Sequence, residues 1–198
     1  LLAYGVPVFI GLISLGLLAA SHITSIGLRT ELVEKYHGVV PLLTKILVYA
    51  PSVGLIIPLF ACMGEEIGWR GFLLSETNNL ETSFKRIFNG VIWSIYHWPL
   101  ILFSDYASSS NRLYSILVFS VFVIFQGVFI CWLQEKSKSL WTSATSHAAH
   151  NLWIIGIFPA FYAENKSTPF FIGEGGLFLT LAYAGVISAV LYFDRKRI

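Results

Sequence analysis

The sequence predicts an all-α membrane protein, a polytopic transmembrane helical bundle of about six to seven spans with a polar cavity in mid-membrane. Only 12% of the residues are charged, about half of the roughly 25% typical of soluble domains, and the mean hydropathy is +0.71. The apolar residues also come in blocks of about 20, the length that a helix needs to cross the hydrocarbon core. The net charge of +2 gives no basis for nucleic-acid binding.

The elements follow from these blocks in chain order. The predicted spans are Leu1–Ala20, Ser52–Ser75, Lys85–Phe103, Leu113–Leu133, Leu140–Phe158 and Gly175–Phe193. A shorter helix at Pro41–Ala50 makes a seventh span if it crosses. The predicted loops are the polar segments Ser21–Gly38, Glu76–Ser83, Ser104–Arg112, Gln134–Ser139 and Pro159–Gly173.

The domain prediction is equally simple. The chain shows no internal repeat and no shift in composition, so residues 1–198 are expected to form a single integral-membrane domain with a motif core at about 52–158. Because the chain opens on Leu1 inside an apolar run, we expect further segments upstream in the natural protein.

Basic residues at the span ends predict the orientation. They gather at the start of the span at Lys85, in the turn at Gln134–Ser139 and in the tail at Arg195–Arg197. With six spans these three places fall on one side, and basic loops stay in the cytoplasm. The compact chain suggests a prokaryotic cell membrane, with the active site opening toward the cytoplasm.

The stretch CMGEEIGWRGFLL concentrates three charges within an apolar run. Glu65, Glu66 and Arg70 lie inside a predicted span, where an ionisable residue is costly and indicates a functional site. Glu66 and Arg70 are four residues apart, so they can form an ion pair on one helix face. Glu65 points about 100° away from Glu66 and is left to face the centre of the bundle.

Polar residues of two further spans arrive at the same depth. At about 1.5 Å per helical residue, Glu65 and Glu66 lie about 15 Å from the basic side, His97 about 18 Å, and His147 and Asn151 about 13 to 20 Å. His147 and Asn151 are four residues apart and share a helix face. Three spans therefore supply carboxylates, imidazoles and an amide to one level of the membrane.

These groups are the parts that hydrolysis of an amide bond requires. A carboxylate can take a proton from the attacking water, and a histidine can share that proton or orient the water. An asparagine amide and a histidine N–H can donate to the oxyanion that develops on the carbonyl. The sequence therefore predicts a membrane protease.

The order and spacing of these residues resemble the three motifs of the CPBP family, which includes type II CAAX prenyl proteases and Abi-like bacteriocin-processing proteins. The matching motifs are Glu65-Glu66-x-x-x-Arg70, Trp93-x-x-x-His97 and His147-x-x-x-Asn151. Trp93 stands where the family usually has Phe. Taken alone each motif is weak, but the three in order on three apolar spans are a specific signal.

The resemblance implies an intramembrane endopeptidase and assigns a role to each motif residue. Glu65 would activate water with help from His97, and His147 and Asn151 would form the oxyanion site. Glu66 and Arg70 would be structural or would orient Glu65, with Trp93 supporting the pocket. The implied substrate is a peptide or protein, either a CAAX-type C-terminal tail, prenylated or not, a leader peptide or a membrane protein, reached from the lipid bilayer.

The residues leave two alternatives open. Glu65, His97 and His147 could hold zinc in a metalloprotease, although the HExxH helix is absent and Asn151 is a poor zinc ligand; we expect no cofactor. A non-catalytic immunity or scaffold protein, or a transporter, would also keep glutamate and histidine in mid-membrane. Asp105 and Asp194 fall in a predicted loop and tail, which excludes an intramembrane aspartyl pair. His150, outside the motifs, is expected to neighbour His147.

Overall fold

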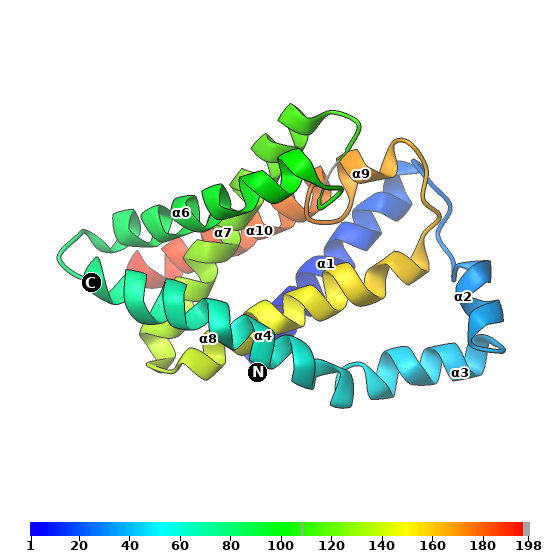
Figure 1. Ribbon diagram of the computed structural model, residues 1–198, viewed down its shortest axis with the longest axis horizontal. Coiled ribbons are helices and arrows are strands. Elements are labelled where there is room, and N and C mark those ends of the chain that lie inside the picture. The colour runs from blue at the N-terminus through cyan, green and yellow to red at the C-terminus, as the bar shows by residue number, and fades with distance from the viewer. Residues whose placement is uncertain (108, 196–198) are drawn as a thin grey trace.

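The computed structural model describes residues 1–107 and 109–195, with the side chain of Arg195 excepted, and these residues form a helical bundle (Figure 1). Its α-helices are α1 (Leu2–Ser21), α2 (Thr30–Lys35), α3 (Val39–Thr44), α4 (Ile56–Glu66), α5 (Leu74–Glu76), α6 (Thr82–Phe103), α7 (Arg112–Ser137), α8 (Leu140–His150), α9 (Thr168–Phe171) and α10 (Leu177–Arg195). No strand occurs in this part of the chain; Ile26 and Tyr162 form an isolated bridge. The predicted all-α class is confirmed.

Short segments of other helix types continue several of these helices. Three are π-helical, η1 (Lys45–Tyr49), η3 (Ile67–Leu73) and η4 (Asn151–Ile157), and two are 3-10 turns, η2 (Val53–Leu55) and η5 (Phe158–Phe161). The sequence did not predict these π segments, because hydropathy is insensitive to one extra residue in a turn. Two of them adjoin the predicted catalytic motifs.

Three of the described helices are long and apolar enough to cross a membrane: α1, α7 and α10. The segments Val39–Tyr49 and Val53–Glu76, bent by 60°, would together make a fourth. The count of six to seven spans stays a prediction. The 22-residue α6 is outside this set, and it carries the buried polar residues Arg86, Asn89 and His97.

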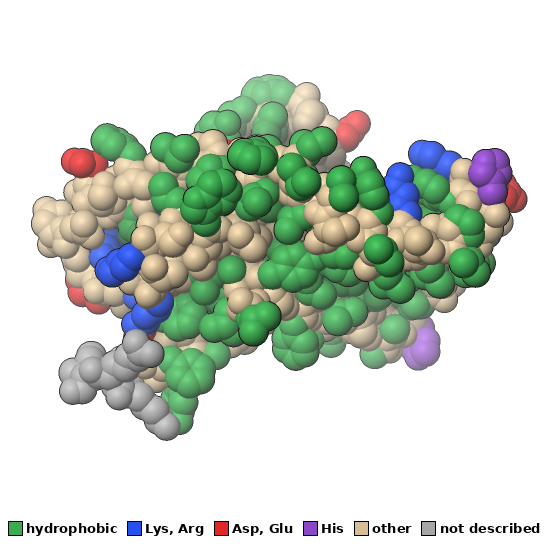
Figure 2. All heavy atoms as spheres, turned by 90° about the horizontal axis from the view of Figure 1, so that it is seen from below, with side chains coloured by type: hydrophobic (Ala, Val, Ile, Leu, Met, Phe, Trp, Pro, Cys, Tyr) green, Lys and Arg blue, Asp and Glu red, His purple; other side chains and the backbone are tan. Residues whose placement is uncertain are grey.

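The face of the molecule seen in Figure 2 is largely apolar. Hydrophobic side chains spread along its middle, and most of the Lys, Arg, Asp and Glu on it lie toward the left and right ends. Large apolar side chains such as Ile57, Phe60 and Phe103 are exposed on the surface. A surface of this kind fits a lipid environment, where exposed apolar groups have no contact with water.

Helix α7 is central to the bundle, since it contacts α6, α8, α10 and η3, while α1 packs against α8 and α10 (Figure 1). The backbones of α6 and α7 meet at Gly90 and Gly127. A Cβ atom added to Gly90 would lie 2.9 Å from the Ile124 Cα, and one on Gly127 would lie 2.9 Å from the Gly90 Cα. This close approach, typical of small residues between membrane helices, brings the motif on α6 against the bundle centre.

Basic and acidic residues join three helices at one end of the bundle. Arg86 of α6 contacts Glu135 of α7 at 2.5 Å and Asp194 of α10 at 2.6 Å. Lys85 lies 2.7 Å from Glu135, and Lys136 lies 3.0 Å from Asp194. We call these five residues the end cluster. They show that the basic residues Lys85 and Lys136 lie at one end of the bundle, as predicted; Lys196 and Arg197 lie outside the described residues.

Two sequence predictions at this end were wrong. The segment Gln134–Ser139 was expected to be a turn, but α7 continues to Ser137 and ends at Lys138, which has a left-handed conformation. Asp194 was assigned to the tail, but it lies in α10, which continues to Arg195. In both cases the sequence analysis took charged residues as the end of a helix. The structure keeps these residues helical, because they form ion pairs with charged residues of the neighbouring helices.

Candidate active site

The glutamates of the first motif lie where an α-helix becomes a π-helix. Glu65 and Glu66 are the last two residues of α4, and η3 begins at Ile67. Asn89 of α6 supports this transition, because its amide nitrogen donates to the Trp69 carbonyl at 2.6 Å. The third motif is built in the same way, since α8 ends at His150 and η4 begins at Asn151. Such π segments are frequent at functional sites.

Glu66 forms the expected ion pair with Arg70, but it also binds a residue that the sequence associated with the oxyanion. Its Oε1 atom accepts from Arg70 Nη1 at 2.9 Å and lies 3.0 Å from His147 Nδ1. The side chains of Glu66 and Arg70 have no solvent exposure, and that of His147 is 6% exposed. Glu66 Oε2 and two Arg70 nitrogens, Nε and Nη2, have no hydrogen-bond partner among the described residues.

Glu65 is only partly buried and pairs with indoles instead of with a charge. Its Oε2 atom accepts from Trp93 Nε1 at 3.2 Å and from Trp69 Nε1 at 3.4 Å. None of the described residues donates to its other oxygen, Oε1. The adjacent glutamates therefore differ in environment: Glu66 is enclosed and bound to a cation, whereas Glu65 keeps one oxygen available.

Trp93 is the residue that joins the three motifs. Besides its bond to Glu65, its ring lies 4.3 Å from the Arg70 guanidinium carbon, 5.0 Å from the His147 ring and 5.9 Å from the His97 ring. An aromatic face beside a guanidinium is a stabilising cation–π arrangement. The three segments that carry the motifs therefore meet at the buried indole of Trp93, as their similar depth predicted.

His97 is oriented by the backbone of its own helix. Its Nδ1 atom lies 2.8 Å from the Trp93 carbonyl oxygen, and because a carbonyl can only accept, Nδ1 carries the hydrogen. The other nitrogen, Nε2, is then the one available for proton transfer. The ring stacks on Tyr106 with centroids 5.9 Å apart and contacts Phe119.

Asn151 is further from these groups than the sequence suggested. Within the described part of the chain its side-chain nitrogen has one hydrogen bond, to Cys62 Sγ at 3.5 Å. Cys62 is one turn before Glu66 on α4 and also lies beside His147. The structure therefore brings Glu65, Glu66, Arg70, Trp93 and His147 together directly. His97 joins this group through its ring contact with Trp93, and Asn151 is connected to it through a thiol.

Sequence reasoning missed a second buried polar group. His150 was expected only to neighbour His147, but its Nδ1 lies 3.1 Å from the Tyr183 hydroxyl and its Nε2 lies 3.1 Å from Glu174 Oε1. The Tyr106 hydroxyl, on the ring that stacks on His97, also lies beside Glu174. Glu174 sits in a Gly-rich loop before α10, and no periodic spacing in the sequence connects it with a histidine in α8.

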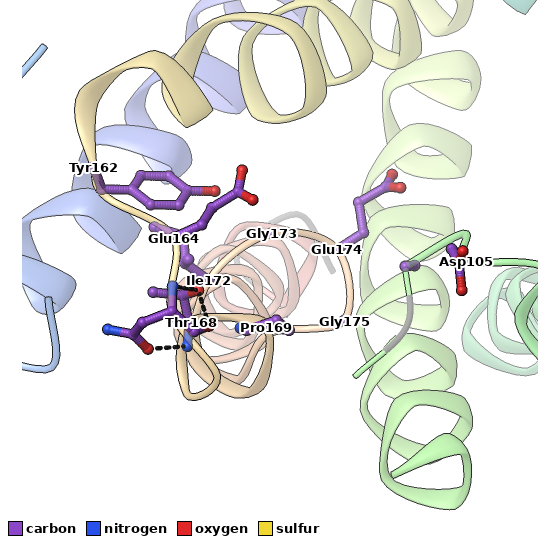
Figure 3. A pocket seen from close by; sticks show the side chains of 11 residues that line it. Asp105, Tyr162, Glu164, Thr168, Pro169, Ile172, Gly173, Glu174 and Gly175 are labelled. Carbon is purple, nitrogen blue, oxygen red and sulfur yellow. Dashed lines mark hydrogen bonds between the residues drawn. The ribbon is translucent and has the colours of Figure 1, made fainter. Parts of the chain in front are cut away.

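Glu174 also lines a pocket at the α9 end of the molecule. The pocket has a volume of about 350 Å³ and includes Asp105, Glu164 and Thr168. Figure 3 shows the Glu174 side chain extending from the loop toward the neighbouring helices, on the opposite side of the pocket from Tyr162. A Cβ atom on Gly175 would lie 2.5 Å from the Ala107 carbonyl oxygen, so this loop is packed tightly against the α6–α7 connection.

The residues of the zinc alternative are not arranged around a common point. Among the described residues, no group of three or more His, Cys, Asp or Glu side chains could hold a metal ion in this conformation. Glu65 contacts two indoles, His97 a backbone carbonyl and His147 the other glutamate. A zinc site would require these three side chains to turn toward one another.

Comparisons with known proteins give a consistent result. A model of the type II CAAX prenyl endopeptidase Rce1-like family matches residues 47–153, close to the predicted motif core. The chain is 28% identical over 147 residues to a protein of Methanococcus maripaludis named CAAX prenyl protease 2, an alignment that covers 72% of this chain and 50% of that protein. The chain thus spans about half the length of this curated relative. No solved structure matches it.

Proposed function

The chain belongs to the Rce1-like family of type II CAAX prenyl endopeptidases, within the CPBP proteases, and we propose that it is an intramembrane endopeptidase that uses glutamate-activated water. The observation that carries the proposal is the difference between the two adjacent glutamates. Glu66 is fully buried and bound to Arg70 and His147, whereas Glu65 is partly exposed and none of the described residues donates to its Oε1. Glu66 Oε2 also lacks a hydrogen-bond partner there, but it is enclosed, so Glu65 is the carboxylate that a water molecule can reach.

The proposed reaction assigns one proton path. Water attacks the carbonyl carbon of the scissile peptide bond as Glu65 Oε1 takes its proton, and His97 Nε2 shares in orienting that water. The proton then passes to the leaving amide nitrogen as the C–N bond breaks, which yields a carboxylic acid and an amine. No cofactor takes part.

The oxyanion would be stabilised by the third motif. His147 Nδ1 donates to Glu66 Oε1, so the ring would donate from Nε2 to the oxyanion when that nitrogen also carries a hydrogen. The Asn151 amide supplies a second donor when it leaves its contact of 3.5 Å with Cys62. Glu66 and Arg70 then act by holding His147 in place.

The substrate class follows from the surroundings of the site. We propose a peptide bond in or near the membrane, in a CAAX-type C-terminal tail, a leader peptide or a membrane protein, reached from the cytoplasmic side. The relative's name refers to prenylated substrates, so a farnesylated CAAX peptide and its unmodified form are the first pair to compare in liposomes.

The test is a substitution of one glutamate against a matched control. Glu65→Gln should lower kcat/KM by about 10² to 10⁴, the usual contribution of a general base. Glu76→Gln changes an exposed carboxylate at the end of the same helical run and should leave the rate unchanged. A Glu65→Gln enzyme with the rate of the unchanged protein would contradict the proposal and favour a non-catalytic role or a transporter.

The zinc alternative has a separate readout. The proposed mechanism predicts full activity after treatment with a strong chelator, and no stoichiometric zinc in elemental analysis of the purified protein. Loss of activity on chelation, restored by added zinc, would replace the metal-free mechanism by one in which Glu65, His97 and His147 rearrange around the ion.

A further inference from the structure

We propose that Trp93 and Trp69 act as a pair of indole donors that position Glu65, so that Oε2 is held and Oε1 is presented to the attacking water. This inference rests on the proposed function and adds two positioning residues to it.

The geometry supports a shared acceptor. Both indole nitrogens reach the same carboxylate oxygen, Trp93 at 3.2 Å and Trp69 at 3.4 Å, while no described residue donates to Oε1. Two donors on one oxygen fix the plane of the carboxylate and leave the lone pairs of the other oxygen unoccupied. A proton acceptor needs one oxygen that accepts no hydrogen bond from the protein, because an oxygen that already accepts two hydrogen bonds is a poorer base.

The two indoles are themselves well fixed. Trp93 is 2% exposed and its ring is enclosed by Arg70, His147 and His97. Trp69 lies in η3, where its carbonyl accepts from Asn89 and its ring packs edge-on against Tyr96 at 5.5 Å. Donors that do not move during the reaction stabilise a charge more effectively than mobile ones.

The four-residue spacing explains how Trp69 reaches this position, because residues i and i+4 are neighbours on a helix surface. Trp69 follows Glu65 by four residues and is the third residue of η3, so its side chain lies one turn beyond the carboxylate. The donor from its own helix and the donor from α6 therefore approach Glu65 from two elements, which resists rotation about the side-chain bonds of the glutamate.

The kinetic test uses substitutions that keep an aromatic ring but remove the indole N–H together with the rest of the five-membered ring; the control variant loses the same atoms. Trp93→Phe should lower kcat about tenfold or more, the loss expected for one hydrogen bond to a charged group, with KM within about twofold. Trp69→Phe, with the longer bond, should have a smaller effect in the same direction. Trp98→Phe is the matched control: it lies on the same helix, donates to Ser120 at 3.0 Å and should leave kcat unchanged.

A second measurement keeps the inference testable if Trp93→Phe does not fold. In protein labelled with ¹⁵N at the indole nitrogens, Glu65→Ala should move two of the six tryptophan N–H resonances, while that of Trp98, assigned through Trp98→Phe, stays in place. If no indole resonance moves, the inference is overturned.

The outcomes separate this inference from the proposed function. An inactive Glu65→Gln enzyme together with Trp93→Phe at the full kcat would overturn the indole pair and leave glutamate catalysis intact. A fully active Glu65→Gln enzyme would overturn both. A fall in kcat that is matched by a fall in the unfolding temperature, with no indole resonance moved, would assign Trp93 to packing alone.

Discussion

Two networks of charged side chains in this protein differ in how many of their carboxylate oxygens lie beside a cation. In the end cluster each carboxylate meets two cations, Glu135 with Lys85 and Arg86, and Asp194 with Arg86 and Lys136. In the middle of the bundle one oxygen of Glu66 takes both Arg70 and His147, and its other oxygen has no partner among the described residues.

The difference indicates different purposes. Incomplete pairing costs free energy in a buried site, because each unsatisfied polar group has lost its water. A network retained at that cost is better explained by chemistry than by stability. The end cluster lies partly in contact with solvent, with the Asp194 side chain 25% and that of Lys136 35% exposed, and it fastens the ends of α6, α7 and α10 together.

The largest effect is expected at Arg70. Arg70→Ala leaves the Glu66 carboxylate fully buried with His147 alone, which should reduce the free energy of unfolding by about 3 to 5 kcal/mol. The measurement is unfolding in detergent micelles, followed by circular dichroism as a denaturing detergent is titrated in. If Arg70→Ala and Arg86→Ala reduce the free energy of unfolding equally, the two networks do not differ in their contribution to stability.

A third pair, His150 and Glu174, should be intermediate. Their side chains are 1% and 10% exposed, so Glu174→Ala leaves His150 Nε2 buried without an acceptor, at a cost of about 1 to 3 kcal/mol. Glu174→Gln keeps an oxygen at the same place and should cost less in the same unfolding measurement. If the two substitutions cost the same, the hydrogen bond to His150 does not contribute.

The smallest effect should come from the end cluster. Arg86→Gln removes one of two cations from each carboxylate, but Lys85 and Lys136 remain, so the loss should be smaller than that of Arg70→Ala, which leaves Glu66 with His147 alone. This loss should shrink at about 1 M salt, where charges are screened within about 3 Å, while the loss from Arg70→Ala should not change. If salt does not change the loss of unfolding free energy caused by Arg86→Gln, the end cluster and the central network are equally shielded from solvent.

The sequence was sufficient for features that repeat at fixed spacing. The apolar blocks located the long helices, and the four-residue separation predicted the pair of Glu66 and Arg70, which is present at 2.9 Å. The approach of His147 to the first motif followed from depth alone, whereas His97 meets that motif through Trp93. These predictions succeeded because the period of a helix converts sequence distance directly into direction.

Contacts between residues of unrelated spacing could not be predicted. Nothing in the sequence indicated that Trp93 would bind Glu65, or that His147 would bind Glu66. Nor did it indicate that Glu174 would reach His150 from a loop. Each depends on the relative rotation of two helices, or on the path of a connection. The single domain, the number of spans and the cytoplasmic side stay predictions.

The π-helical segments have a consequence for comparing relatives by length. A π turn contains one residue more than the α turn it replaces, so deleting any one residue of Ile67–Leu73 would permit a regular helix of almost unchanged hydropathy. Because the wide turn absorbs the extra residue, that deletion would leave Glu65 and Glu66 in nearly the same direction relative to the residues that follow. A single-residue gap at this stretch in an alignment therefore marks the loss of the π turn beside the two glutamates, and not a change in the face on which the motif lies.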